Sequence, residues 1–217
     1  MTADQKIEQS LLISTLTLRR AIGLIGAAFP FVMAAGGLLL GAREILDSIS
    51  AYYHTGMRDI FVGALCAIGI FLLCYKGYEL KDRIAAITAG AGSIGTALLP
   101  TALSDEPVGA EKLLGILHWA FAAVFLLSLT YIAIGLFTKK SATPTPRKLA
   151  RNRVYRICGW TMAACLVLLL IYSVLPPDAK AALKPLHPVF VLESLAVFSF
   201  GFTWLTKGEV LLKDQAA

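Results

Sequence analysis

Residues 113–138 read LLGILHWAFAAVFLLSLTYIAIGLFT, an uninterrupted stretch without lysine, arginine, aspartate or glutamate. A helix needs about 20 predominantly apolar residues to cross the ~30 Å hydrocarbon core of a bilayer. This stretch exceeds that length, so it predicts a transmembrane helix with room to tilt. The pattern recurs along the chain, because five further apolar stretches lie between short charged loops.

The six apolar stretches predict an all-α fold: a polytopic membrane helix bundle with six transmembrane helices in one domain, 1–217. The chain is 57% hydrophobic and 16% charged, whereas soluble domains carry roughly 25% charged residues. The longest polar connector, 139–153, is too short to fold as a separate domain. We expect the transmembrane spans at about 21–41, 59–75, 84–103, 113–138, 154–175 and 188–206.

Lysine and arginine are distributed unevenly between the two sides of this bundle. Fifteen fall in the N-terminus, the second and fourth loops and the C-terminus, against five in the remaining loops. Cytoplasmic loops are enriched in these residues, so both termini are expected in the cytoplasm, N-in and C-in. The expected location is the inner membrane of a bacterium, with membrane lipids as partners and homo-oligomer formation left open. The net charge of +6 is explained by this topology, and nucleic acid is not expected as a partner.

The first outer loop, 42–58, is expected to contain a short interfacial helix. Written as a helix, it places Asp47, Ser50 and His54 along one side and a tyrosine, Tyr52 or Tyr53, on another. Two interpretations stay open. The helix lies on the membrane surface with its tyrosines at headgroup level, or it also covers a site that the polar row serves.

Acidic residues near the outer side are the candidates for chemistry. Glu193 is expected about 9 Å below the outer boundary of the membrane. A carboxylate at such depth costs a few kcal/mol and almost always faces the bundle interior or a wet cavity. Glu193, Asp59 and Ser50 are therefore the candidate catalytic residues. The alternative is a purely structural hydrogen bond from Glu193 to His118 or to a hydroxyl such as that of Thr101.

All three histidines are expected toward the same outer side, as candidate metal ligands: His54, His118 and His187. Three imidazoles suit Zn²⁺ and leave a position for an activated water. The first hypothesis is thus a metal-dependent membrane hydrolase acting on lipid or amide substrates, with zinc as cofactor. A second is a small transporter, or a proton-coupled or sensory protein, in which Glu193 and His118 form a protonatable pair. A third is a non-catalytic scaffold whose polar cluster only fixes helix packing.

Two stretches, Ser48–Gly63 and Glu193–Gly208, are similar to small multi-span bacterial membrane proteins of unknown function, which implies no activity. Separately, Ser50-x-x-x-His54 followed by Asp59 and later histidines resembles the alkaline ceramidase and adiponectin-receptor superfamily of membrane hydrolases. That resemblance implies a zinc site built from His54, Asp59, His118 and His187. The chain departs from the family pattern in having six spans instead of seven, an early aspartate and no C-terminal His-x-x-x-His pair.

Overall fold

The computed structural model describes residues 3–77, 79–104, 107–139 and 145–213, with side chains described from Thr15 onward. Within these ranges every regular element is helical, which confirms the all-α class. Two short 3-10 helices, η1 and η3, and one π-helical segment, η2, accompany the α-helices. The elements in chain order are α1 (Ala3–Leu39), η1 (Ser50–His54), α2 (Arg58–Leu73), α3 (Leu80–Leu98), α4 (Gly109–Tyr131), η2 (Ile132–Leu136), α5 (Pro146–Ser173), α6 (Pro177–Leu183), η3 (Lys184–Leu186) and α7 (Pro188–Lys207).

Local chemistry explains where two of the helices begin. The Thr145 hydroxyl accepts a hydrogen bond from the backbone N–H of Lys148 at 3.1 Å, and Pro146 occupies the first turn of α5. Both features favour a helix start, because the first N–H groups of a helix have no partner within it. At the start of α3, Glu79 and Asp82 exchange side-chain and backbone hydrogen bonds in a capping box.

Tight glycine contacts hold neighbouring helices together. Helix α1 packs on α7, α7 on α5, α2 on α3 and α3 on α4. A Cβ atom added to Gly201 of α7 would lie 2.7 Å from the Cα of Ala27 in α1. One added to Gly92 of α3 would lie 2.8 Å from the backbone N of Phe125 in α4. Such close backbone approach through small residues is typical of helix packing in membranes.

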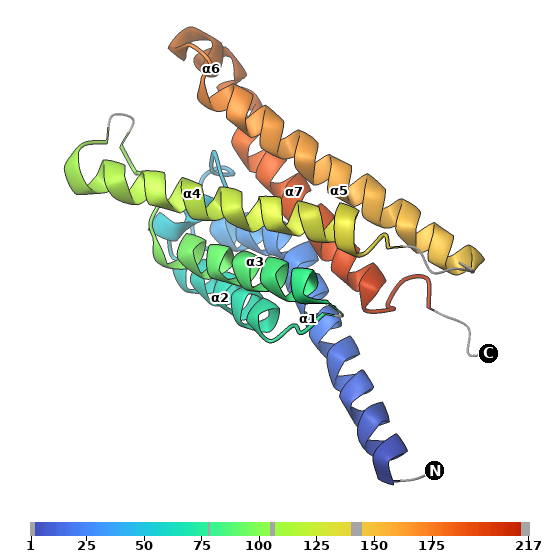
Figure 1. Ribbon diagram of the computed structural model, residues 1–217. Helices are drawn as coiled ribbons and strands as arrows, with labels where there is room; N and C mark the ends of the chain where they lie inside the picture. The colour runs from blue at the N-terminus through green and yellow to red at the C-terminus, as the bar shows by residue number, and fades with distance from the viewer. Residues whose placement is uncertain (1–2, 78, 105–106, 140–144, 214–217) are drawn as a thin grey trace.

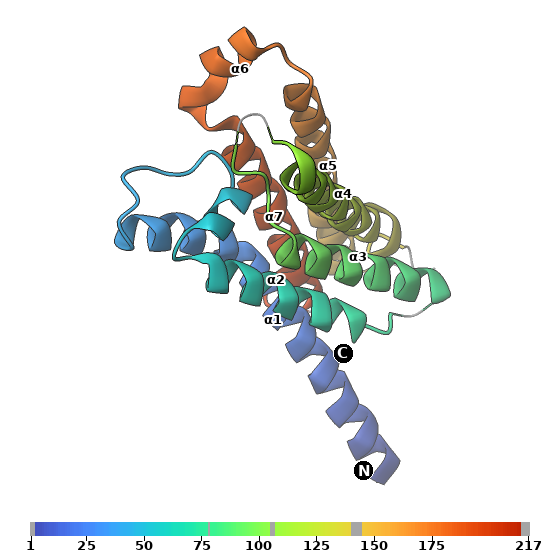
Figure 2. The same ribbon diagram turned by 90° about the vertical axis from the view of Figure 1, so that its left-hand side faces the viewer.

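The long helices alternate in direction, so that their loops gather at two ends of the bundle (Figures 1 and 2). At the end that carries α6, a loop residue that follows α1, Asp47, contacts His187 before α7, and His54 contacts Thr101 beyond α3. At the opposite end, Arg20 of α1 contacts Gly208 after α7. The N-terminal part of α1 extends away from the other helices in both views.

Among the residues that the structure describes, four helical segments are long and apolar enough to cross a membrane: Thr15–Leu39, Gly109–Leu136, Pro146–Ser173 and Pro188–Lys207. Many large apolar side chains on the outside of the bundle are exposed; Leu170 is 64% exposed and Ile157 60%. Exposed apolar surface of this extent needs a nonpolar environment. The length and composition of these helices indicate a membrane protein.

The expected helix boundaries need correction in places. Helix α3 does not continue to Leu103 but ends at Leu98, since Leu99 precedes Pro100 and is extended (φ −97°, ψ 126°). Helix α2 is only 16 residues long, and α5 begins eight residues before the expected span, because Thr145 and Pro146 start it early. The short helix α6, between α5 and α7, was not expected.

Candidate functional site: the loop between α1 and α2

The loop between α1 and α2 folds back over one end of the bundle. Gly41, with φ of +97°, allows the chain to turn sharply after α1. Tyr52 and Met57 are then buried against α1, with 0% and 1% of their surface exposed. A Cβ atom at Gly37 or Gly36 would collide with these two side chains. The loop is therefore anchored by side chains that fit into the glycine face of α1.

Only part of this loop is helical. The 3-10 helix η1 covers Ser50–His54, and the Ser48 hydroxyl starts it by accepting the N–H of Ala51 at 2.9 Å. The expectation that one helix aligns Asp47, Ser50 and His54 along a single side is wrong. The three side chains reach three different elements, because the backbone before Ser50 is irregular.

Ser50 and His118 form the central contact of the site. The Ser50 Oγ lies 3.0 Å from Nε2 of His118 in α4, and the His118 Nδ1 lies 2.7 Å from the backbone carbonyl of Leu99. A carbonyl only accepts hydrogen bonds, so in the neutral imidazole Nδ1 carries the proton. Nε2 is then the acceptor, and Ser50 donates to it. His118 is 2% exposed, which keeps this pair out of bulk water.

Glu193 binds the backbone of the loop at Ile49 and Ser50. Its Oε2 accepts a hydrogen bond from the N–H of Ile49 at 2.7 Å, and the N–H of Ser50 also interacts with this carboxylate. The sequence offered, as the alternative to a catalytic role, a structural hydrogen bond from Glu193 to His118 or to the Thr101 hydroxyl; the partners in the structure are instead the backbone N–H groups of Ile49 and Ser50. A carboxylate satisfied by adjacent backbone N–H groups is a favourable arrangement away from water. Glu193 consequently fixes Ser50 in position beside His118.

A small cavity of about 50 Å³ lies directly beside these groups. Ser50 and Glu193 contribute polar surface to it, and most of the remaining lining is apolar, from α1, α2, α4 and α7. This volume holds a few water-sized groups. The other lining residues are Phe29, Ile49, Phe61, Leu65, Thr96, Ala122, Phe125, Leu126 and Val197.

The remaining predicted site residues do not join Ser50. The Nε2 of His54 lies 2.8 Å from the carbonyl of Thr101. The Nδ1 of His187 lies 3.2 Å from Oδ1 of Asp47. Asp59 is exposed in the first turn of α2. In the part of the chain that the structure describes, no three His, Cys, Asp or Glu side chains are grouped closely enough to hold a metal ion.

His54 faces a second, more open cleft of about 500 Å³ between the loop and the start of α4. Glu111 also lines it, and its carboxylate accepts the N–H groups of Leu103 and Ser104, each at 2.8 Å, and the Ser104 hydroxyl at 2.6 Å. These bonds tie the start of α4 to the loop that precedes it, and they shape one wall of this cleft.

Two contacts of the site were not anticipated from the sequence. The Leu99 carbonyl that orients His118 is a backbone group, and no side-chain pattern reports it. Its only signal is Pro100, which forces Leu99 out of the helix and frees this carbonyl from the helical hydrogen-bond ladder. The pairing of Asp47 with His187, supported by Lys184 at 3.8 Å, joins residues far apart in sequence.

Comparison with known proteins adds no relative to this picture. No protein-family model, no curated protein and no solved structure matches the chain. The two resemblances drawn from short motifs therefore have no supporting relative. The class that the fold defines is an all-α protein whose described part contains four helices long and apolar enough to cross a membrane.

Proposed function

We propose that this chain is a six-crossing protein of the bacterial inner membrane, with both termini in the cytoplasm, that hydrolyses a lipid ester or amide. Helices α2 and α3, at 16 and 19 residues, are about 24 and 28 Å long at 1.5 Å per residue. Those lengths approach the ~30 Å of a bilayer core. The excess of lysine and arginine at the end opposite Ser50 supports the orientation.

The contact between Ser50 and His118 carries the hydrolase proposal. A serine whose hydroxyl donates to an imidazole, itself oriented through its other nitrogen, is the arrangement of an activated nucleophile. Ser50 Oγ would bond to the substrate carbonyl carbon while its proton passes to Nε2 of His118. His118 would then protonate the departing alcohol or amine, and water would release the acyl group from Ser50. Glu193 is a positioning residue, because it holds the Ile49–Ser50 backbone.

The apolar lining of the cavity beside Ser50 favours an apolar group next to the bond that is cleaved, and at about 50 Å³ the cavity would admit only a few atoms of the substrate. Zinc, expected from the histidine pattern, stays a separate prediction. The histidines would have to leave their present partners to share one ion. The transporter or sensory hypothesis likewise stays a prediction.

A second candidate function is the non-catalytic scaffold, and one observation favours it. Glu193, His54 and His118 each contact a backbone group of a neighbouring segment, which is how structural polar residues close a bundle end. Under this alternative Ser50 has no unusual reactivity.

An alkyl fluorophosphonate separates the two candidates. In the proposed reaction the Ser50 Oγ–P bond forms, the P–F bond breaks, fluoride leaves and the proton goes to His118. We expect stoichiometric labelling of the purified protein, lost in Ser50→Ala and reduced at least about 100-fold in rate in His118→Gln, as for loss of a general base. Ser173→Ala, an exposed serine at the end of α5 whose hydroxyl bonds only within its own turn, should still be labelled. No labelling of the folded wild-type protein, or labelling retained in Ser50→Ala, would favour the scaffold.

A further inference from the structure

A groove of about 380 Å³ lies between α3 and α4 on the outside of the bundle, and we call it the α3–α4 groove. Six of its lining residues matter here: Lys81, Ile84 and Thr88 of α3, and Leu127, Ser128 and Tyr131 of α4. Helix α3 begins at the end of the bundle where η2, the continuation of α4, finishes, because Lys139 forms ion pairs with Glu79 and Asp82. The groove thus starts at the end opposite Ser50 and shares no residue with that site.

The walls of the groove are apolar and face outward. Ile84 and Leu127 are large apolar side chains that remain exposed. Leu127 belongs to the segment Gly109–Leu136, which is long and apolar enough to cross a membrane. The volume of the groove falls within the range of about 300–1,000 Å³ that is usual for small-molecule sites. An apolar groove of this size on such a surface favours an acyl chain over a polar ligand.

Two hydroxyl groups that line the groove, those of Ser128 and Tyr131, have no hydrogen-bond partner among the described residues. By contrast, the hydroxyls of Thr88 and Thr130 each donate to a carbonyl of their own helix, at 2.9 and 2.8 Å. The Tyr131 ring lies over the π-helical turn η2, since a Cβ atom added to Gly135 would be 3.1 Å from it. Such turns are frequent at functional sites. Hydroxyls in apolar surroundings gain free energy from an acceptor, such as an ester carbonyl.

Lys81 places an ammonium group at the end of the groove where α3 begins. The carboxylates nearest to it in sequence, Glu79 and Asp82, both bind Lys139, at 2.9 and 3.4 Å. Within the described part of the chain, no carboxylate forms an ion pair with Lys81. Its side chain is exposed, so its charge is open to an anion from outside the chain.

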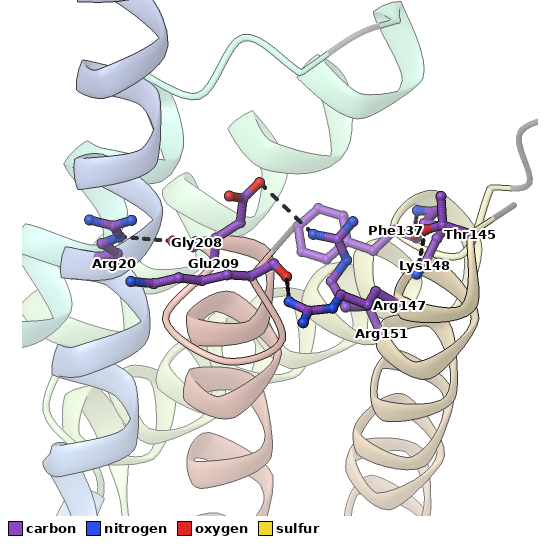
Figure 3. A network of polar contacts seen from close by, with 9 residues as sticks. Arg20, Phe137, Thr145, Arg147, Lys148, Arg151, Gly208 and Glu209 are labelled. Atoms are coloured by element: carbon purple, nitrogen blue, oxygen red, sulfur yellow. Dashed lines mark hydrogen bonds and ion pairs between the residues drawn. The ribbon is translucent and has the colours of Figure 1, made fainter. Parts of the chain in front are cut away.

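Other cations at this end of the bundle bind groups of the chain itself (Figure 3). Arg20 Nε donates to the Gly208 carbonyl at 2.8 Å, and Lys148 Nζ donates to the Phe137 carbonyl at 3.2 Å. Lys81 has no such contact with the residues that the structure describes. It therefore differs from these cations in having its ammonium group available to a ligand.

We propose that the α3–α4 groove binds one anionic phospholipid of the surrounding membrane. Lys81 binds the phosphate at the end of the groove. The Tyr131 and Ser128 hydroxyls, further along the groove, donate to the ester carbonyls, and the apolar walls hold an acyl chain. On the proposed topology this end faces the cytoplasm, where anionic lipids are enriched. The inference rests on that topology and is independent of the chemistry proposed at Ser50.

Native mass spectrometry of the purified full-length protein in neutral detergent counts the lipids that stay bound. The protein is titrated with phosphatidylglycerol or with phosphatidylcholine of the same acyl chains. We expect one phosphatidylglycerol to bind per chain, at least about tenfold more tightly than phosphatidylcholine, as for one added charge-assisted hydrogen bond. Equimolar inorganic phosphate should not displace it. Displacement by phosphate would identify a site for a soluble anion, and equal binding of the two lipids would identify unspecific lipid contact; either result overturns the proposal.

Matched variants locate the lipid. Lys81→Gln should lower the affinity for phosphatidylglycerol about tenfold and leave phosphatidylcholine unchanged. Arg83→Gln removes an exposed cation of α3 that does not line the groove, and it should bind like wild type. Thr88→Phe fills part of the groove and should weaken phosphatidylglycerol, whereas Ile87→Phe places the same ring at the exposed neighbouring position and should not. Equal weakening by Lys81→Gln and Arg83→Gln, or unchanged binding in Thr88→Phe, would overturn the proposal.

Discussion

Glu193 and Ile49, 144 residues apart in sequence, are joined by a 2.7 Å hydrogen bond from a backbone N–H to a carboxylate. The bond links α7 to the loop between α1 and α2, and it sets the position of Ser50. A single side chain on one helix therefore organises the backbone of a distant loop. This makes the loop the part of the fold most sensitive to change at Glu193.

Replacing Glu193 by alanine should loosen that loop. The N–H of Ile49 would lose its acceptor in a buried environment, at a cost of about 1–3 kcal/mol in unfolding free energy. Glu193→Gln keeps one acceptor oxygen and should show an intermediate effect. Trypsin cleavage after the exposed Arg43 measures loop opening and should accelerate in Glu193→Ala. Asp59→Asn removes an exposed carboxylate just beyond the loop and should leave the cleavage rate unchanged. Cleavage of Glu193→Ala at the wild-type rate would contradict the role assigned to Glu193.

The contact between α1 and α7 should be intolerant of added volume. Gly201→Ala places a Cβ atom against the backbone of Ala27, and overpacking of this kind costs about 1–3 kcal/mol. Gly63→Ala is the matched control, because nothing lies within 4 Å of the added Cβ atom. Thermal unfolding in detergent should show a lower unfolding temperature for Gly201→Ala alone. Equal unfolding temperatures for both variants would mean that the two helices separate more readily than their packing indicates.

Chelation distinguishes the serine mechanism from the zinc mechanism. His54 and His187 contact Thr101 and Asp47 rather than facing His118. We therefore expect fluorophosphonate labelling to persist after dialysis against a strong zinc chelator and in His54→Ala. Metal content, measured by mass spectrometry before and after dialysis, accompanies the assay. Stoichiometric zinc whose removal abolishes labelling would instead support the metal site expected from the sequence.

Alkaline pH should weaken the link between α3 and the end of α4. The hydrogen bond from Lys139 to Glu79, with an ion-pair distance of 2.9 Å, holds the pKa of Lys139 above its ordinary value. A raised pKa means that the stabilisation is complete below about pH 10 and is lost as the pH rises through the raised value. Unfolding temperatures measured from pH 8 to 11 should fall less steeply for Lys139→Gln than for wild type. Lys112→Gln, an exposed lysine on α4, should retain the wild-type slope.

Much of the helical framework was predictable from the sequence. Each of the six apolar stretches contains a helix, because long apolar blocks between charged loops leave few alternatives for the backbone. The predicted ends are less accurate. Caps and prolines set them, as Thr145 does at the start of α5 and Pro100 does beyond α3. The number of membrane crossings and their orientation stay predictions.

The candidate site was predictable only in part. Ser50, His118 and Glu193 were each singled out, but the partners that the structure gives them were not. Helical periodicity misplaced Asp47 and His54 because it assumes a regular loop. The decisive acceptor for His118, the Leu99 carbonyl, and the donors to Glu193 are backbone groups. The identity of a side chain does not indicate which backbone groups will lie beside it in the folded chain.

The π-helical turn Ile132–Leu136 gives the last part of α4 one more residue than an ordinary helical turn needs. The extra residue rotates the side chains that follow it by about 100° around the helix axis. Phe137 comes directly after the turn, and its ring packs against Trp204 and Tyr155. Deletion of a single residue from this turn, Gly135 for instance, would turn the Phe137 ring away from Trp204. The contact between the end of α4 and the end of α7 thus depends on how many amino acids the turn contains.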